Sequence, residues 1–288
     1  MLNVLILGAS GLLGNAVFRH LSENCYQKYK VWGTVRSQNS DDLFPKKYIN
    51  RIIKVNDLLN TKDLENVISF SAPDIIINCL SVNQKDFVDT SKLLRIFSIF
   101  PQKLKFLCNE RNIRLIQISS DAVYSGSKGY YSETDLPDFI DDYGMSKFLG
   151  EVSSENCLTI RSSFIGHDIS NKKGLVNWFL SQNDSCKGYT NYIFSGFPVN
   201  VFSEILADKI LDNKSLFGIY HVASNPISKY DLLQLIADVY EKEIAITPDK
   251  TISIDRSLNS EKFLISTGYK PPNWKALIKS MNNFSKKN

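Results

Sequence analysis

Short apolar runs alternate with amphipathic segments along the first half of the chain. The runs are continuously apolar and rich in branched side chains, which is typical of buried strands; they are Leu2–Leu7, Val31–Val35, Arg51–Val55, Asp74–Cys79 and Leu115–Ile118. Apolar residues at helical spacing predict helices over Leu12–Glu23, Thr61–Phe70 and Phe87–Arg111. Because each crossover helix covers one face of a parallel sheet, the alternation predicts a doubly wound, Rossmann-type α/β fold.

The alternation becomes irregular from about Asn171. Helical patterns recur over Gly174–Leu180, Phe202–Leu211, Lys229–Tyr240 and Trp274–Met281. We therefore expect an α/β domain over residues 1–170 and a smaller lobe, mainly residues 171–288, packed over the mouth of the sheet. Ile160 and 220–222 read as strands that return to the main sheet, so the boundary is not sharp.

Three glycines follow the first strand at three-residue intervals, in the sequence GASGLLG from Gly8 to Gly14. Between a strand and a helix, such a turn lets backbone amides approach a pyrophosphate and places the anion at the helix N-terminus. The alternative is a tight turn with a close helix–strand contact. The place of the turn in the first βα unit favours dinucleotide binding, with Ser10, Gly11, Leu12 and Leu13 completing the expected cofactor turn.

The end of the second strand bears on which dinucleotide is bound. An acidic residue there usually holds the ribose hydroxyls of NAD, whereas an arginine accommodates the 2′-phosphate of NADP. Here Arg36 follows the strand and no acid occurs until Asp41. The sequence therefore favours NADP(H) over NAD(H), with a merely solvated Arg36 as the alternative.

A tyrosine and a lysine four residues apart begin a later helical segment, at Tyr143 and Lys147. This spacing places both side chains on one helix face, although it also occurs by chance on amphipathic helices. A phenol titrates near pH ~10, so acid–base work near neutrality needs a nearby positive charge. Ser120 directly follows the fifth strand, at the sheet edge where such folds bind ligands, and its hydroxyl is suited to hydrogen-bond a carbonyl oxygen.

Composition excludes several other classes of protein. The 34 basic and 30 acidic residues leave a net charge of +4 without clustering, so a nucleic-acid footprint is not expected. The five cysteines are dispersed and form no C-x-x-C pair, which predicts neither a disulfide framework nor a zinc site and fits a cytoplasmic setting. The three histidines show no ligand spacing, so no metal is expected. The chain starts without a leader pattern or an apolar run of bilayer length, which predicts no membrane association.

Taken together, these motifs resemble the extended short-chain dehydrogenase/reductase family, and within it the dTDP-4-dehydrorhamnose reductases and related nucleotide-sugar reductases. The resemblance covers nearly the whole chain. Besides the glycine turn, it is carried by the segments ISSDAVY at 118–124, YGMSK at 143–147, IRSS at 160–163, GIYHV at 218–222 and RSLNSEK at 256–262.

The resemblance implies roles for the three catalytic candidates. Tyr143 would be the general acid, Lys147 would hold the nicotinamide ribose and lower the pKa of the tyrosine, and Ser120 would orient the substrate carbonyl. The similar reductases usually carry threonine at the position of Ser120, a difference that keeps the hydroxyl.

The resemblance also implies further contacts to cofactor and substrate. Asp57 and Leu58 look like the adenine-contacting pair, and 79–81 like the segment beside the pyrophosphate and ribose, where Cys79 and Leu80 replace smaller residues and Ser81 follows. Five residues are candidates for substrate contact because of their position in the segments that resemble the family; they are Asp121, Tyr124, Trp178, Phe197 and Arg256. Arg256 suits a diphosphate, whereas core packing is an equal alternative for Trp178.

The resemblance thus implies an NADP-dependent reductase that delivers hydride to the C4 ketone of a nucleotide-linked sugar, in deoxysugar or polysaccharide biosynthesis. Residues 1–170 would be its dinucleotide-binding domain and residues 171–288 mainly its substrate-binding lobe; a homodimer is a further expectation. Two alternatives stay open: a nucleotide-sugar 4-epimerase, and a non-catalytic regulatory subunit that binds NADP. A 4,6-dehydratase is disfavoured because Asp121-Ala122 lacks the second acid of an acidic pair.

Overall fold

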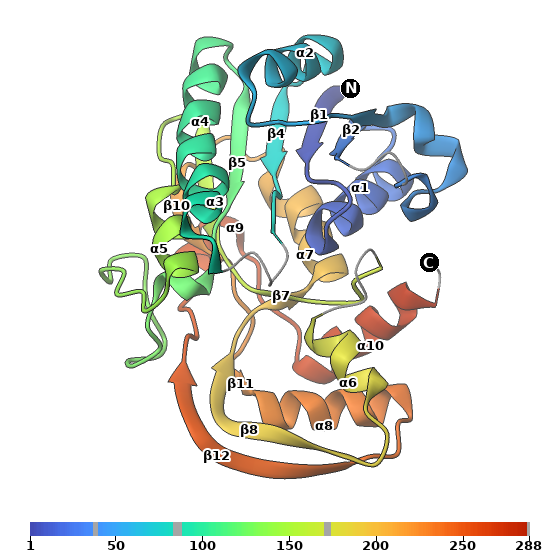
Figure 1. Cartoon of the computed structure of the whole chain (residues 1–288), viewed down its shortest axis with the longest axis vertical. Coiled ribbons are helices and arrows are strands. Elements are labelled where there is room, and N and C mark those ends of the chain that lie inside the picture. Colours follow the sequence, from blue (N-terminus) through green and yellow to red (C-terminus); the bar gives the residue numbers. More distant parts are fainter. Residues whose placement is uncertain (37–39, 83–87, 170–173, 287–288) are drawn as a thin grey trace.

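The computed structural model describes residues 1–36, 40–82, 88–169 and 174–286. Within them, the largest sheet has seven strands in the order β10-β6-β5-β4-β1-β2-β3, all paired in parallel (Figure 1). Its strands are β1 (Leu2–Leu7), β2 (Tyr29–Val35), β3 (Ile52–Lys54), β4 (Ile75–Asn78), β5 (Arg114–Ile118), β6 (Cys157–Arg161) and β10 (Gly218–His221). This confirms the Rossmann-type α/β fold.

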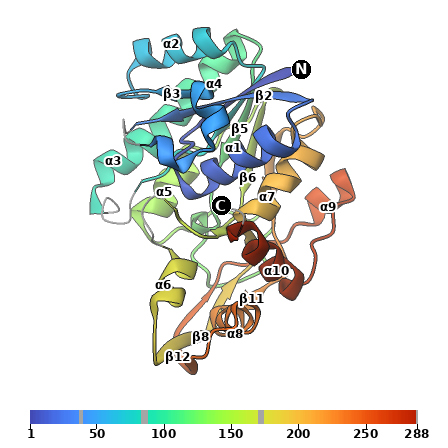
Figure 2. The same ribbon diagram turned by 90° about the vertical axis from the view of Figure 1, so that its right-hand side faces the viewer.

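Helices cover both faces of this sheet because successive side chains of a strand point to opposite faces. Val4 and Ile6 of β1 join one apolar cluster, and Leu5 and Leu7 join another. On the main sheet the first cluster lies against α1 (Leu12–Asn24) and α7 (Val199–Ile205), and it continues to α10 (Trp274–Ser285) and α8 (Lys229–Tyr240), which packs on the second sheet described below. The second lies against α2 (Thr61–Ser71) and α4 (Phe100–Glu110). Figure 2 shows the two layers on either side of the strands.

Two of the expected helices contain a wider π-helical turn. The run predicted over Phe87–Arg111 consists of α3 (Thr90–Leu94), the π-helical turn η4 (Arg95–Ile99) and α4, and Phe87 itself lies outside the described residues. In the same way, α7 continues into the π-helical turn η6 (Leu206–Ile210). Two 3-10 turns, η1 (Asp41–Leu43) and η2 (Lys46–Arg51), lie between β2 and β3.

The second half of the chain builds a separate sheet that the sequence pattern did not predict. Its order is β11 (Ile227–Ser228), β8 (Ser185–Phe194) and β12 (Ala245–Asp255), and α8 packs against β8. β8 and β12 are rich in polar residues, and their buried positions are separated by exposed or partly exposed ones, so they lack the apolar run of a buried strand. The other elements of this half are α6 (Leu175–Ser181), α9 (Glu261–Thr267) and the short pair β7 (Phe164–Ile165) and β9 (Phe197–Pro198).

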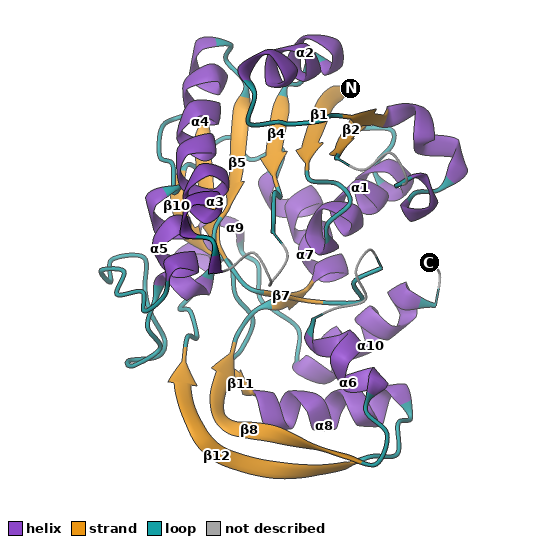
Figure 3. Ribbon diagram, in the orientation of Figure 1, coloured by secondary structure: helices purple, strands orange, loops and turns teal. Residues whose placement is uncertain are grey.

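The carboxyl ends of β1, β4 and β5 point toward this second sheet (Figure 3). The segments that follow β5 are the 3-10 turn η5 (Asp121–Val123) and α5 (Asp142–Leu149), which carry the predicted catalytic residues. β10 joins the edge of the main sheet beside β6, so the second half of the chain contributes to both sheets. The expected boundary between residues 170 and 171 lies outside the described residues. Among the described helices, none combines the length and apolar character needed to span a membrane.

Candidate active site

The glycine turn after β1 is shaped by close backbone contacts. Gly8 has a φ of +81°, a left-handed conformation that favours glycine, and a Cβ there would lie 3.1 Å from the carbonyl oxygen of Cys79. A Cβ on Gly14 would lie only 2.2 Å from the carbonyl oxygen of Gly8. Glycine at these two positions therefore lets α1 pack directly against the turn.

The N-terminus of α1 is suited to an anion. Gly11 is its N-cap, and among the described residues no side chain caps this end and no acidic residue stands in the first turn. Thr34 fixes the turn, because its Oγ1 accepts a hydrogen bond from Gly8 N at 3.1 Å and its carbonyl accepts one from Ala9 N at 2.9 Å. The uncapped amides and the helix dipole fit a pyrophosphate group.

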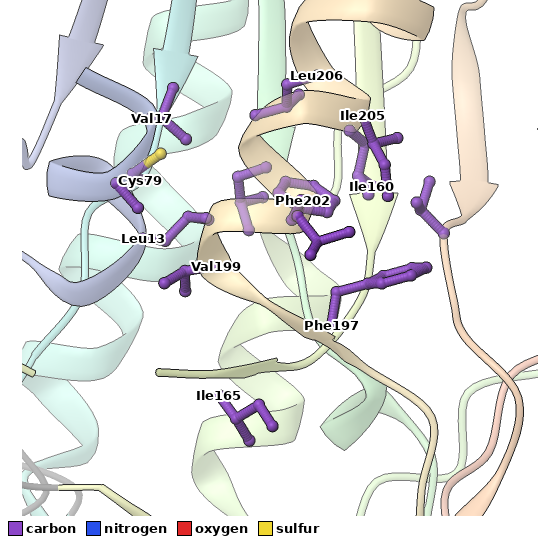
Figure 4. Close-up of a cluster of buried hydrophobic side chains, with 14 of the residues drawn as sticks. Leu13, Val17, Cys79, Ile160, Ile165, Phe197, Val199, Phe202, Ile205 and Leu206 are labelled. Carbon is purple, nitrogen blue, oxygen red and sulfur yellow. The ribbon is translucent and has the colours of Figure 1, made fainter. Parts of the chain in front are cut away.

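The segment after β4 lies beside this turn. Leu80 N donates to Asn78 Oδ1 at 3.2 Å, and Ser81 follows on the exposed side. The Cys79 side chain is buried with Leu13 and Val17 in the apolar cluster between α1, α7 and the sheet (Figure 4). Cys79 thus faces the glycine turn with its backbone, while its thiol belongs to the core.

The candidates for the adenosine end lie at the edge of the main sheet. Arg36 follows β2 directly and Asp57 comes shortly after the neighbouring strand β3. Both residues are exposed, whereas Leu58 packs partly against the apolar cluster beneath α2. Asp57 Oδ1 accepts a hydrogen bond from Leu59 N at 2.9 Å, which fixes the turn.

Ser120, Tyr143 and Lys147 come together at the end of β5. Asp141 caps α5 by accepting a hydrogen bond from Gly144 N at 2.7 Å, and this places Tyr143 in the first turn of the helix. Lys147 Nζ donates to the carbonyl oxygen of Ile118 at 3.1 Å and lies 5.9 Å from the centre of the Tyr143 ring. Ser120 is the N-cap of η5, and its Oγ accepts a hydrogen bond from Ala122 N at 3.1 Å.

Burial shifts the pKa values of both titratable members of this group. Burial raises the pKa of Tyr143 to about 12, although hydrogen bonding to Ser120 opposes the shift. The family resemblance implied that Lys147 lowers this pKa; instead desolvation raises it, so the phenol stays protonated at neutral pH. Burial also lowers the pKa of Lys147 to about 8.

Asp121 faces charged residues of the second sheet and α8. Burial raises the pKa of Asp121, while Arg256, hydrogen bonds to Ser120 and Ser163, and Lys229 oppose the shift. Lys229 Nζ lies 3.7 Å from the centre of the Tyr192 ring. Lys229 and Tyr192 were not predicted from the sequence, because neither belongs to a recognisable motif and β8 has no apolar strand pattern.

Arg256 connects this charged group to the start of α5. Its Nη2 lies 3.8 Å from Asp141 Oδ2, and its side chain is 12% exposed. Its Nε is buried and has no hydrogen-bond partner among the described residues. Arg256 therefore keeps a donor that is not used within the described part of the chain.

The other three residues predicted to contact the substrate, Tyr124, Phe197 and Trp178, do not belong to the charged group around Asp121. Tyr124 is fully buried, and its hydroxyl donates to the Ser132 carbonyl at 2.9 Å and accepts from Arg161 at 2.5 Å. Phe197 is fully buried in the apolar cluster near Phe202 (Figure 4). Neither side chain has surface to offer a ligand in this structure, so neither is part of the site proposed below. Trp178 lies on α6 and is 43% exposed.

A cavity of about 320 Å³ lies between α1, α7, α10 and residues 166–169. Of the predicted site residues, only Leu12 lines it. It is therefore distinct from the group at the end of β5. Within the described residues, no cluster of His, Cys, Asp or Glu could hold a metal ion, and the five cysteines are free thiols.

Comparisons with known proteins place the chain in a family. The chain is 27% identical over 249 residues to the probable low-salt glycan biosynthesis reductase Agl14 of Haloferax volcanii, covering 81% of this chain and 79% of that protein. It is 25% identical to methionine adenosyltransferase 2 subunit beta of Xenopus tropicalis, covering 82% and 71% of the two chains. The fold matches dTDP-4-dehydrorhamnose reductase of Bacillus anthracis in complex with NADP, with a TM-score of 0.79, 18% identity and 98% coverage of both chains.

A family model, that of the RmlD substrate binding domain, matches residues 2–285. The match spans both sheets and all the helices described above, so it is not limited to the dinucleotide-binding motif that many folds share. The chain therefore belongs to the RmlD substrate-binding domain family, and its resemblance to the dTDP-4-dehydrorhamnose reductases among the extended short-chain dehydrogenases/reductases is confirmed.

Proposed function

We propose that this protein is an NADP-dependent reductase that converts the C4 ketone of a nucleotide-linked sugar to an alcohol, in deoxysugar or polysaccharide biosynthesis. The observation that carries the proposal is the convergence of Ser120, Tyr143 and Lys147 at the carboxyl edge of the sheet. Membership in a family that contains sugar-nucleotide reductases supports an oxidoreductase.

The cofactor would lie along the carboxyl edge of the main sheet, in the dinucleotide-binding domain of residues 1–170. The amides of the Gly8–Gly14 turn would hold the pyrophosphate at the uncapped start of α1. Exposed Arg36 would pair with the 2′-phosphate, with Asp57 and Leu58 at the adenine and the segment 79–81 along the ribose and pyrophosphate. A nicotinamide cofactor, when bound, supplies the hydride.

The residues of the chain would then orient the ketone and supply the proton. The Ser120 hydroxyl would hydrogen-bond the carbonyl oxygen, and Tyr143 would donate its phenolic proton to the same oxygen as the C4 carbon is reduced. A pKa of about 12 keeps Tyr143 protonated near neutrality, as an acid requires. Lys147, with a pKa of about 8, would contribute a positive charge and hold the nicotinamide ribose.

The nucleotide sugar would bind between the two sheets. Arg256 has an unused buried donor and would pair with the diphosphate. Asp121 adjoins Ser120 and would contact the sugar, and Trp178 on α6 is exposed enough to contribute. We therefore assign substrate binding mainly to residues 171–288, with Asp121 contributed by the first domain.

The test is NADPH consumption by the wild-type protein and Tyr143→Phe, offered 4-keto-6-deoxy sugars linked to dTDP, UDP or GDP. We expect turnover with NADPH in preference to NADH and an alcohol product identified by mass spectrometry and NMR. Loss of a general acid should lower kcat by about 10²- to 10⁴-fold in Tyr143→Phe while NADPH still binds. Tyr29→Phe, which removes the hydroxyl of another buried tyrosine, at the start of β2, is the matched control. Equal turnover by Tyr143→Phe and wild type would exclude Tyr143 as the acid.

The similarity to methionine adenosyltransferase 2 subunit beta favours a second candidate, a non-catalytic subunit. A protein of this kind would bind NADPH, reduce no member of the panel, and keep its biological activity in Tyr143→Phe. An epimerase would instead invert the C4 alcohol of a nucleotide sugar without net consumption of NADPH.

A further inference from the structure

A buried hydrogen-bond network begins at Ser119, the residue that precedes Ser120. At its centre is an ion pair between Glu151 and Arg161, whose side chains are 4% and 3% exposed. Arg161 Nε donates to Glu151 Oε1 at 2.7 Å and Arg161 Nη2 donates to Oε2 at 2.6 Å. The pair is thus bidentate, an arrangement that fixes orientation as well as distance.

This ion pair is connected to the residues next to the catalytic group. Glu151 Oε1 also accepts a hydrogen bond from Ser119 Oγ at 2.8 Å, and Ser119 immediately precedes Ser120. Glu151 follows Lys147 by four residues, just beyond the end of α5. Because Lys147 Nζ bonds the Ile118 carbonyl, two consecutive residues at the end of β5 are held by the same short segment of chain.

The guanidinium of Arg161 is fixed from its other side as well. Its Nη1 donates to the Tyr124 hydroxyl at 2.5 Å, and that hydroxyl donates to the Ser132 carbonyl at 2.9 Å. Arg161 ends β6, which pairs with β5 in the main sheet. The network therefore ties β5, β6 and the end of α5 into one unit behind Ser120.

We propose that Glu151 and Arg161 are positioning residues, which act through Ser119 to hold Ser120 at a fixed distance from the Tyr143 and Lys147 side chains on α5. The inference rests on the proposed function, because it assigns these three residues to the reaction. Neither Glu151 nor Arg161 touches the reacting atoms. Their effect on the reaction is geometric, and a displacement of the order of 1 Å at a catalytic group reduces rates about 10²-fold.

Glu151 also acts on Lys147 through its charge. Burial lowers the pKa of Lys147, and nearby Cys79 and Glu151 oppose this shift. Replacing Glu151 by a neutral isostere should therefore lower the pKa of Lys147 further. Lys147 is faced by Cys79, Glu151 and Tyr143. The titratable groups around the other end of the network are Tyr124, His221, Glu133 and Asp135.

The first test is Ser119→Ala, which removes one hydroxyl and leaves the ion pair in place. We expect kcat to fall at least about tenfold while KM for the nucleotide sugar changes by less than about threefold, because orientation rather than binding is lost. Ser71→Ala is the matched control, since Ser71 is also buried and its Oγ donates one hydrogen bond, to the Val67 carbonyl at 2.7 Å in α2. A wild-type kcat in Ser119→Ala would overturn the proposal.

The second test is the pH profile of Glu151→Gln. We expect the loss of activity at high pH to begin about 0.5 pH unit or more below that of the wild type, because Lys147 loses its proton more easily. If Glu151 had a purely structural role, Glu151→Gln would lower the yield or thermal stability of the protein without changing the pH at which activity is lost. Removing one partner of a buried ion pair is strongly destabilising, so Ser119→Ala decides the question if Glu151→Gln does not fold. A folded Glu151→Gln with the wild-type profile and kcat would contradict the proposal.

The two proposals fail in distinguishable ways. If the wild-type protein reduces none of the 4-keto-6-deoxy sugars linked to dTDP, UDP or GDP, the proposed function is wrong. If the wild type is active and Ser119→Ala and Glu151→Gln are equally active, the positioning role of Glu151 and Arg161 is wrong. Crystal structures of wild type and Ser119→Ala give an answer that needs no substrate. We expect Ser120 or the Tyr143 end of α5 to be displaced in the variant, and superimposable positions would overturn the positioning role.

Discussion

Ser119 and Asp121 flank Ser120, and the two sides of this turn differ in how their polar groups are satisfied. On the inner side, Ser119 belongs to the Glu151–Arg161 network, where both carboxylate oxygens are bonded. On the outer side, Asp121 faces the cations Arg256 and Lys229, and Arg256 Nε has no hydrogen-bond partner among the described residues. Buried polar groups are normally bonded, so an unused donor needs a reason.

The comparison separates residues that build the site from residues that can receive a ligand. On the inner side, each side-chain nitrogen and oxygen of Ser119, Glu151 and Arg161 has at least one hydrogen-bond partner within the chain, and the effect of this network is to fix geometry. A group of cations with a spare donor is suited to a diphosphate, which accepts several charge-assisted hydrogen bonds. Mutations on the two sides should therefore have different effects. A mutation on the inner side should lower kcat or the stability of the protein, whereas a mutation on the outer side should raise KM.

Among changes to the residues on the two sides of Ser120, Arg256→Ala on the outer side should have the largest effect on the kinetic constants. A hydrogen bond to a charged group contributes about 1.5–3 kcal/mol, so KM for the nucleotide sugar should rise about 10- to 100-fold while kcat changes much less. Steady-state kinetics at saturating NADPH measure both constants. Lys187→Ala on β8 is the control, because its side chain is 75% exposed. An unchanged KM in Arg256→Ala would show that Arg256 does not bind the diphosphate.

The inner side should also set the alkaline limit of activity. Burial lowers the pKa of Lys147 to about 8, so its positive charge is present below this pH and is lost as the pH rises through it. We expect kcat to fall about tenfold per pH unit well above pH 8, while Tyr143 stays protonated throughout. A pH–rate profile from about pH 6 to pH 10 measures this. A profile that stays flat to its upper end would show that the charge on Lys147 is not required.

Tyr124→Phe tests whether this residue belongs to the inner side. The change removes the hydroxyl that bonds Arg161 and Ser132, so the free energy of unfolding should fall by about 1–3 kcal/mol. Urea unfolding gives the stability, and kinetics should give an unchanged KM. The opposite result, a raised KM with wild-type stability, would indicate that Tyr124 contacts the substrate.

The smallest effect is expected for Lys229→Gln on the outer side. Lys229 stands over the Tyr192 ring and near Asp121, and its loss removes one partly screened charge worth about 1 kcal/mol. KM should rise about three- to sixfold with kcat unchanged, as measured under the conditions used for Arg256→Ala. A larger effect than that of Arg256→Ala would reverse the ranking of the two cations.

Features of the chain that depend on short-range spacing were predictable from the sequence. The strand–turn–helix around Gly8 and Gly14 and the four-residue spacing of Tyr143 and Lys147 are local, because neighbours along a strand or helix are set by its period. The short apolar strands predicted the parallel sheet for the same reason, since a strand buried on both faces must be apolar throughout. The family resemblance extended this reading to the whole chain.

The surroundings of these residues depend on contacts between distant segments and became visible only in the folded structure. β8 and β12 are half-exposed strands without an apolar signature, so their pairing, and with it the approach of Lys229 and Arg256 to Asp121, was not predictable from pattern. Tyr124 and Phe197 proved to be buried. The pKa of Tyr143 is raised rather than lowered because desolvation depends on everything packed around a side chain, and that packing joins segments far apart in the sequence.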